Sequence, residues 1–377
     1  MNKIMMFSVL LLGVCAFLIF IGAGKVEDSD TKAYILMEAD TKTVLEELNS
    51  DIKLRSGYLT KLMSILVVAE KIDNGELSIS ELLTASESVK NTKGSVIWLE
   101  NGDILSVEEL LKSVIIGNAN DALTVLAERI SGDIDTFVMD MNAKAFELGM
   151  RNTFYSSPYG YFDEAEFSTA HDIALVCSEL TRFDFLTNFF TTWRDFVKEG
   201  KVELVSENKF TNNYSNHIGF KACHSDESGY CIAECGRNDN GETFIVVSLG
   251  ADNEDVLYNT VKTLLKKAFR QFKVTLTMFP EEMLKPLKVI GGVETAVEIG
   301  LDKQAKVTVA KEKHDLRTKI IYPDYIKAPV NIGQPIGCVA FFSGDTLVYE
   351  SNIVAKKDIL ALSFGFVFRS MLLKMIE

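Results

Sequence analysis

The first feature of the pattern is an apolar run at residues 4–24, which contains no charged side chain and follows Lys3. A basic residue before such a run is typical of an export signal, and the run is also long enough to span a bilayer. The acidic stretch EDSD follows at 27–30, so the charge pattern orients the remainder outward. We therefore expect residues 1–25 to be a signal peptide or an N-terminal membrane anchor. The rest should lie on the extracytoplasmic face of the cell membrane, in the cell envelope.

Beyond this leader the pattern predicts strands, then a block of helices. Residues 32–47 alternate around a turn-like stretch and indicate two strands. Residues 59–75 are apolar on nearly every face and end at a glycine, which predicts a buried central helix. Helical periodicity continues at 106–132, with a polar break at 117–121, and then at 134–150 and 167–183. Ser106 with Glu109 fits a capping box, and Ser168 or Thr169 is expected to cap the last helix.

After residue 200 the pattern changes back toward strands. Residues 229–237 and 242–251 indicate two strands around the turn signal NDNG, and 256–272 is an amphipathic helix. Short strands, turns and most of the prolines follow, so we expect a separate small all-β domain over 273–357. The final residues, 358–377, are apolar but interrupted by Arg369 and Lys374, and we expect an amphipathic segment in the membrane interface. A terminal helix packed on the protein is the alternative.

Composition narrows the possible partners. The 377 residues are enough for two domains. The formal net charge is −14 and no cluster of lysine and arginine stands out, so we expect no nucleic acid as a partner. Six cysteines are present, but they lack the paired spacing of a metal site, so we expect neither metal nor cofactor. Cys231 and Cys235 would share one face of a strand, too far apart to bridge easily. Most cysteines are expected to be buried small apolar residues.

Several stretches in order carry a resemblance to a known family. They are LTKLM at 59–63, GSVIWLENGD at 94–103, EELLKSVIIGNANDALTVLAE at 108–128, FVMDMNAKAFELGMRNTF at 137–154, SPYGY at 157–161, GFKACHSDESGYCIAECGR at 219–237 and the segment 328–359. The chain resembles the D-alanyl-D-alanine carboxypeptidases, which are low-molecular-mass penicillin-binding proteins and serine peptidases of the penicillin-recognising fold. The resemblance covers about residues 30–377. It implies an α/β (α+β) β-lactamase/transpeptidase-like domain at 26–272, with an antiparallel sheet flanked by helices and a helical insert. The small β domain would follow.

The resemblance implies three catalytic motifs. In S-x-x-K the lysine lies one helical turn from the serine, and as a buried amine it serves as base. In S-x-N the serine relays protons and the asparagine holds the substrate amide. In K-T-G, on a strand edge, the lysine attracts the substrate carboxylate and the glycine admits the peptide backbone.

This sequence departs from all three motifs. The first is Tyr58-Leu59-Thr60-Lys61, with Tyr58 at the nucleophile position and Lys61 at the base position. The second is Asn118-Ala119-Asn120, with Asn118 at the serine position. The third, implied to bind substrate, is Lys221-Ala222-Cys223. Lys61, Asn120 and Lys221 are kept, while both serines and the Thr-Gly pair are lost.

No substitute nucleophile stands out. A tyrosine oxygen lies too far from its backbone to meet the oxyanion donors. Ser56 is five residues before Lys61 and off the required helix face, and the spacings Ser29/Lys32 and Ser206/Lys209 are interpreted as chance. Cys223 and His224 are adjacent on a predicted strand, so they should point to opposite faces.

The kept residues also have structural explanations. Lys61 would then be a solvated or carbonyl-capped relic, and Lys221 one of many surface lysines. Asn118 and Asn120 would cap a helix beginning at Asp121. Trp98 and Trp193 are expected to be packing residues.

Three hypotheses for function remain. The first is a catalytically degenerate homologue that binds peptidoglycan stem peptide, or a protein partner in the envelope, without hydrolysis. The second is an active D-Ala-D-Ala carboxypeptidase with altered motifs. The third is a structural envelope protein whose pocket is closed by Tyr58.

Overall fold

The computed structural model describes residues 31–160, 165–277, 279–312 and 316–366. The chain divides into two compact units, one up to Arg270 and one from Gln271 onward. The leader predicted at 1–25 and the end of the predicted C-terminal amphipathic segment, 367–377, lie outside the described residues. Within the described part, no helix is both long and apolar enough to cross a membrane.

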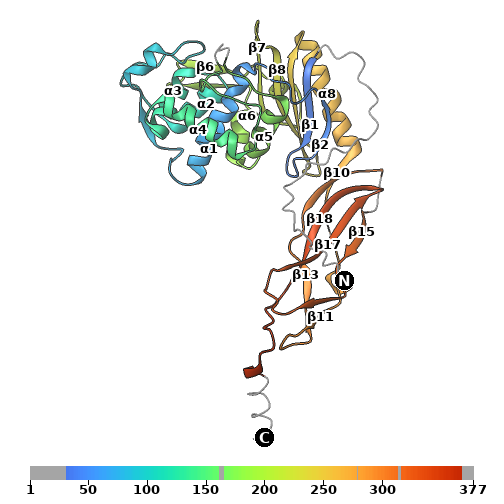
Figure 1. The fold of residues 1–377 in the computed structure, drawn as a ribbon. Coiled ribbons are helices and arrows are strands. Elements are labelled where there is room, and N and C mark those ends of the chain that lie inside the picture. The colour runs from blue at the N-terminus through green and yellow to red at the C-terminus, as the bar shows by residue number, and fades with distance from the viewer. Residues whose placement is uncertain (1–30, 161–164, 278, 313–315, 367–377) are drawn as a thin grey trace. The chain divides into compact units, whose positions relative to one another are not determined.

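The first unit is built on a five-stranded sheet (Figure 1). Its strands run in the order β2-β1-β9-β8-β7, and each neighbouring pair is antiparallel. Their bounds are β1 Thr31–Glu38, β2 Val44–Leu48, β7 His217–Ser225, β8 Gly229–Arg237 and β9 Thr243–Ala251. The predicted strands at 32–47, 229–237 and 242–251 are thus confirmed, and β7 forms an edge of the sheet.

Both faces of this sheet are covered by helices. Alternate side chains such as Ile35 and Val247 join the main core, where α5 (Ala170–Leu180) packs on β1, β8 and β9. On the other face Phe244 meets Phe269 of α8 (Glu254–Gln271), with ring centroids 5.8 Å apart. The strands are therefore apolar on both sides, which explains their nearly continuous apolar sequence.

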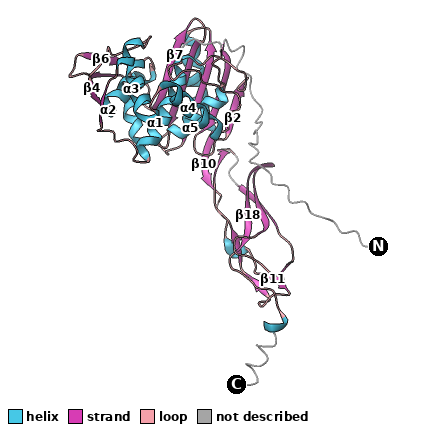
Figure 2. Cartoon of the chain, turned by 60° about the vertical axis from the view of Figure 1, so that its left-hand side comes forward, coloured by secondary structure: helices cyan, strands magenta, loops and turns pink. Residues whose placement is uncertain are grey.

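A helical block lies beside the sheet (Figure 2). Its first helix, α1, is buried continuously from Lys61 to Ala69, as the apolar pattern predicted. The block and its short connecting elements are η1 Gly57–Thr60, α1 Lys61–Asp73, β3 Leu82–Thr84, η2 Glu87–Asn91, β4 Ile104–Ser106, α2 Val107–Ile115, α3 Asn120–Ser131, α4 Ile134–Glu147, α6 Asp184–Phe190, β5 Arg194–Val197, β6 Val202–Val205 and α7 Phe210–Asn213.

The helix ends test the capping predictions. Ser106 and Glu109 form the expected capping box on α2, and α5 is capped by Thr169 rather than Ser168. The prediction that Asn118 and Asn120 cap a helix is wrong: α3 begins at Asn120 itself, behind Ala119, and no side chain caps it.

From residue 272 to 362, the regular elements among the described residues of the second unit are strands and one short 3-10 turn. These are β10 Phe272–Leu276, η3 Glu281–Met283, β11 Leu287–Ile290, β12 Ala296–Val297, β13 Ile299–Leu301, β14 Lys306–Ala310, β15 Leu316–Ile321, β16 Tyr325–Lys327, β17 Pro335–Ser343 and β18 Thr346–Ala355. Phe341, Val339 and Ile353 lie at the centre of its own apolar core. An all-β C-terminal unit is thus confirmed.

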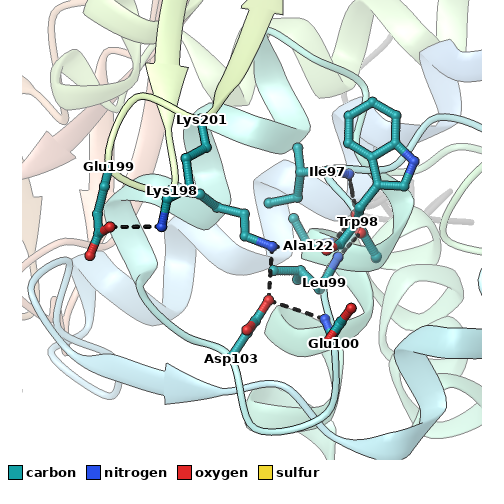
Figure 3. Close-up of polar contacts among 10 residues, drawn as sticks. Ile97, Trp98, Leu99, Glu100, Asp103, Ala122, Lys198, Glu199 and Lys201 are labelled. Carbon is teal, nitrogen blue, oxygen red and sulfur yellow. Dashed lines mark hydrogen bonds and ion pairs between the residues drawn. The ribbon is translucent and has the colours of Figure 1, made fainter.

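The packing prediction for the tryptophans is wrong, since Trp98 is 70% exposed and Trp193 is 44% exposed. The N–H groups of Ile97 and Leu99 both bind the buried carboxylate of Asp121, so these two flanking side chains turn inward. The Trp98 carbonyl accepts a hydrogen bond from Lys198. Figure 3 shows the indole projecting away from these contacts. Because the N–H groups of Ile97 and Leu99 and the carbonyl of Trp98 are all held by hydrogen bonds, the Trp98 side chain is directed toward solvent.

Candidate functional site

The first motif lies on a turn that is held by a close backbone approach. Tyr58 belongs to η1, and α1 begins three residues later at Lys61. Gly160 packs directly against this turn: a Cβ on it would lie only 2.1 Å from the carbonyl oxygen of Gly57. Gly160 also has a φ of +75°, which glycine adopts without strain. Glycine is thus required at position 160 by its close approach to the first motif.

Lys61 is fully buried and has a backbone partner. Its Nζ donates a hydrogen bond of 2.9 Å to the carbonyl oxygen of Tyr159 and lies 4.2 Å from the centroid of the Tyr58 ring. Burial, reinforced by the positive charge of Lys221, lowers the pKa of Lys61 to about 7. The amine would therefore suit a base at neutral pH, but it faces a ring and a carbonyl where the motif needs a serine hydroxyl.

Tyr58 is poorly suited to replace that serine. Its side chain is half-buried, and burial, with further contributions from Glu207 and Cys223, raises its pKa above the ordinary value for tyrosine. Lys61 lies over the face of the ring, so its contact does not activate the phenol oxygen. The geometry and the electrostatics both oppose a phenolate nucleophile here.

The second motif fills the break between α2 and α3. Asn118 has a φ of +56°, a left-handed conformation that asparagine tolerates better than most residues. Its side chain is buried, and its Oδ1 has no hydrogen-bond partner among the described residues. Asn120 is fully buried, and its Nδ2 donates a 2.7 Å hydrogen bond to the carbonyl oxygen of Lys93. Asn120 thus fixes the preceding loop.

A chain of hydrogen bonds connects the first motif to the second. The Tyr159 carbonyl holds Lys61, and the Tyr159 hydroxyl lies 2.7 Å from the hydroxyl of Thr124. Thr124 in turn donates to the backbone oxygen of Asn120. The fold therefore brings the two motifs together as the resemblance implied.

The third motif lies on the edge strand β7. Lys221 is buried, and its Nζ donates to the carbonyl oxygens of Val114 and Ile115, at 3.1 and 2.6 Å. These two carbonyl groups lie in the last turn of α2, where a helix offers no N–H partner of its own and where a positive charge is favourable. Burial lowers the pKa of Lys221 to about 8. Lys221 is therefore not the surface lysine of the structural alternative but a tie between β7 and α2.

Cys223 and its neighbour have separate environments. The Cys223 side chain is buried against the first motif, with Sγ 3.5 Å from the carbonyl oxygen of Ser56. His224 is exposed and stacks on Tyr230, with ring centroids 4.0 Å apart. The pKa of Cys223 is raised well above its usual value, chiefly by its hydrogen bond with Cys231. No Cys–His nucleophile pair is formed by these two residues.

A cavity of about 150 Å³ remains between the first motif and β7. Tyr58 and Cys223 line it, together with Arg55, Ser56, Gly57, Gly160, Glu166, His224, Ser225, Glu227 and Ser228. Lys61, Lys221 and Ala222 do not line it. The cavity is well below the roughly 300–1,000 Å³ of sites for drug-sized ligands, so it suits one or two small residues. The Tyr58 ring narrows the cavity but does not close it.

Glu166 is a site residue that the sequence did not reveal. It is buried, accepts a 2.5 Å hydrogen bond from Thr60 and further ones from Ser156 and Ser157, and burial raises its pKa. Glu166 follows the SPYGY segment in the sequence, but its distance from the three motifs does not identify it as a site residue. Its position depends on a loop folding back onto η1.

The alternative serines do not form a second Ser–Lys site in the described residues. The Ser56 hydroxyl is 3.3 Å from that of Thr60, while Lys209 forms an exposed ion pair with Glu254. Ser29 lies outside the described residues. Over the described ranges, no group of three His, Cys, Asp or Glu side chains is placed to hold a metal ion.

Comparisons with known proteins identify the family of this chain. Residues 22–253 match the D-alanyl-D-alanine carboxypeptidase family, and residues 273–360 match the C-terminal domain of penicillin-binding protein 5. The chain therefore belongs to the D-alanyl-D-alanine carboxypeptidase family. The chain is 31% identical to the D-alanyl-D-alanine carboxypeptidase DacF of Bacillus subtilis over 340 residues, which are 89% of this chain and 87% of the relative. It is 27% identical to DacC of Escherichia coli, over 88% of this chain and 84% of that protein.

The crystal structure of penicillin-binding protein 5 from Haemophilus influenzae has the same fold. The TM-score is 0.81 at 24% identity, over 90% of this chain and all of that one. The expected antiparallel sheet with flanking helices and a C-terminal β unit is thereby confirmed.

Proposed function

We propose that this chain is a catalytically degenerate member of its family that binds the D-Ala-D-Ala end of peptidoglycan stem peptides without hydrolysing it. The observation that carries the proposal is the environment of Lys61. The amine at the base position has a pKa of about 7, yet its neighbours are the Tyr58 ring face and the Tyr159 carbonyl. A base is thus kept in an arrangement that offers it no nucleophile to activate.

One feature favours retained binding over a purely structural role. The cavity beside Tyr58 remains open and has the size for a short peptide end. The buried Oδ1 of Asn118, which has no hydrogen-bond partner among the described residues, does not line this cavity and adds no support for peptide binding there.

The compartment and the domain division also belong to the proposal. We place the chain on the outer face of the cell membrane, with residues 1–25 as leader or anchor, 26–272 as the peptide-binding domain and 273–357 as the β domain. Of the predicted segment 358–377, Ile359 is buried in the core of the β unit, and the residues that follow it, which include exposed Leu360 and Phe364, would rest on the membrane surface. The family membership and the apolar run at 4–24 support this placement.

The test combines a turnover assay with a binding assay. The full-length protein, purified in mild detergent, is mixed with a pentapeptide ending in D-Ala-D-Ala, and D-alanine release and binding are measured. We expect saturable binding, no release, and no binding of the same peptide ending in L-Ala-L-Ala.

Release of D-alanine that is lost in Lys61→Ala would establish the active-enzyme hypothesis instead. Absence of both binding and release would leave a structural protein or a binder of another envelope protein.

A further inference from the structure

Two buried cysteines lie directly opposite each other at the edge of the sheet. In the antiparallel pair β7–β8, Cys223 is the register partner of Cys231. Side chains of register partners project from the same face of a sheet, with Cβ atoms about 4.5–5.5 Å apart. Both cysteines are free thiols, buried at 5% and 0% exposure.

The two thiols influence each other's ionisation. The neighbouring thiol raises the pKa of Cys223 and lowers that of Cys231. Cys231 also accepts a 3.4 Å hydrogen bond from the backbone N–H of Gly250. The thiolate, which is the form that attacks disulfides, is thus favoured at Cys231 rather than at Cys223.

One member of the pair is reachable. Cys223 lines the cavity beside Tyr58, whereas Cys231 lies behind it. A small thiol reagent that enters the cavity therefore meets a sulfur whose partner thiol lies just beneath it.

We infer that Cys223 and Cys231 are a disulfide site, oxidised to a cross-strand bridge by thiol–disulfide exchange with a small external disulfide. Cys223, which lines the cavity, loses its proton and attacks the reagent RS–SR, whose S–S bond breaks to release RS⁻ and leave a mixed disulfide on Cys223. The Cys231 thiolate then attacks the Cys223 sulfur of that mixed disulfide and releases the second RS⁻. The two cysteine thiols lose two electrons and two protons in total, and the reagent becomes two molecules of RSH.

The bridge would alter the cavity wall. The Cys223 Sγ now lies 3.5 Å from the Ser56 carbonyl oxygen, and it would also be 3.3 Å from a Cβ on Gly57. Turning this sulfur toward Cys231 withdraws it from the first motif. The inference does not depend on peptide binding, since it rests on the cross-strand register of the two cysteines and on the position of Cys223 at the cavity.

Two other buried cysteines serve as internal controls. Cys235 is also on β8, but its register partner is Gly219, which has no sulfur. Cys177 lies on α5 and is fully buried. Both should remain thiols under conditions that oxidise the proposed pair.

The experiment uses the full-length protein in mild detergent. It is equilibrated in buffers of increasing oxidised-to-reduced glutathione ratio, quenched with acid, then denatured, alkylated and mapped by peptide mass spectrometry. We expect Cys223 and Cys231 to lose alkylation together and to appear as one linked peptide pair, while Cys177 and Cys235 stay alkylated. Continued alkylation of Cys223 and Cys231 at the most oxidising ratio would overturn the inference.

Variants separate a true pair from general thiol oxidation. Cys235→Ser should keep the bridge, while Cys231→Ser should leave Cys223 only as a thiol or a glutathione mixed disulfide. Linkage of Cys223 to any other cysteine in wild-type protein would also refute the assignment.

Discussion

The residues that line the cavity differ from the family motifs, whereas the residues just behind them keep the two lysines of those motifs. On the wall, Tyr58 and Cys223 stand where the motifs have serine and glycine. Behind it, Lys61 and Lys221 are the lysines that the motifs require, and both are buried with carbonyl partners. The kept residues thus have packing and hydrogen-bonding roles of their own. Retention of a motif lysine is therefore no sign of retained chemistry.

The strongest test of this contrast is the pH dependence of stability due to Lys61. Its pKa is lowered to about 7 in the folded protein, against 10.5 for an ordinary lysine. Between these values the unfolded chain binds a proton at Lys61 that the folded protein does not, so stability should rise with pH. We expect wild type to gain on the order of 3–4 kcal/mol relative to Lys61→Met from pH 6.5 to 10.

Urea denaturation of both proteins across this range measures the difference. Below about pH 7 the two stabilities should run parallel. Parallel curves over the whole range would mean that Lys61 has the pKa of an exposed lysine. That result would contradict a buried lysine behind the cavity wall.

Truncations one helical turn apart should separate the wall from the core. Leu62 is 1% exposed and part of the main core, whereas Tyr58 is half-buried at the cavity. Leu62→Ala should cost about 3 kcal/mol, as expected for a cavity in a packed interior, and Tyr58→Ala about 1 kcal/mol. Thermal unfolding checks both, and equal losses would show that Tyr58 is simply another core residue.

Helix α2, whose C-terminal carbonyls bind Lys221, can be destabilised at its N-terminus. Ser106 caps α2 through a capping box, and the last carbonyls of α2 bind Lys221. Ser106→Ala should cost about 1 kcal/mol. Exposed Ser80, whose hydroxyl lies 3.1 Å from that of Ser78, is the matched control, and Ser80→Ala should change stability little. Equal losses of stability in Ser106→Ala and Ser80→Ala would contradict a stabilising role of Ser106 as the N-cap of α2.

The smallest effect is expected for the Tyr58 hydroxyl. Tyr58→Phe keeps the ring beneath Lys61 and should change stability by less than about 0.5 kcal/mol. Tyr159→Phe is the control, because that hydroxyl lies 2.7 Å from Thr124 in a buried contact, and its loss should cost about 1 kcal/mol. A large loss of peptide binding or of D-alanine release in Tyr58→Phe would show that the phenol is functional.

Much of this arrangement was predictable from the sequence because it depends on local pattern. Continuous apolar character predicted the burial of α1, and the polar break at 117–121 predicted two separate helices. The grouping of Lys61, Asn120 and Lys221 in one site came from the family resemblance and not from local pattern. The partners of the lysines were not predictable, since the carbonyls of Tyr159, Val114 and Ile115 reach them only through tertiary folding.

The errors have the same physical origin. Trp98 was expected in the core because it is large and apolar, but the Asp121 carboxylate fixes Ile97 and Leu99 inward and turns Trp98 outward. Asn118 and Asn120 have the composition of helix caps, but Asn118 occupies a left-handed turn and Asn120 binds a loop carbonyl. For Trp98 and Asn120 a contact distant in sequence decided the outcome, and for Asn118 the local backbone conformation did.

The most direct test of a lost nucleophile is intact-protein mass spectrometry of the full-length protein after exposure to excess penicillin, with Tyr58→Ser run beside it. A serine at this position would face a buried amine of pKa about 7, so an adduct on Tyr58→Ser alone would locate the loss at residue 58. No adduct on either protein would extend the loss to Asn118 or to Ala222-Cys223. Wild type is predicted to keep its unmodified mass, and a penicilloyl adduct on wild type would contradict the account.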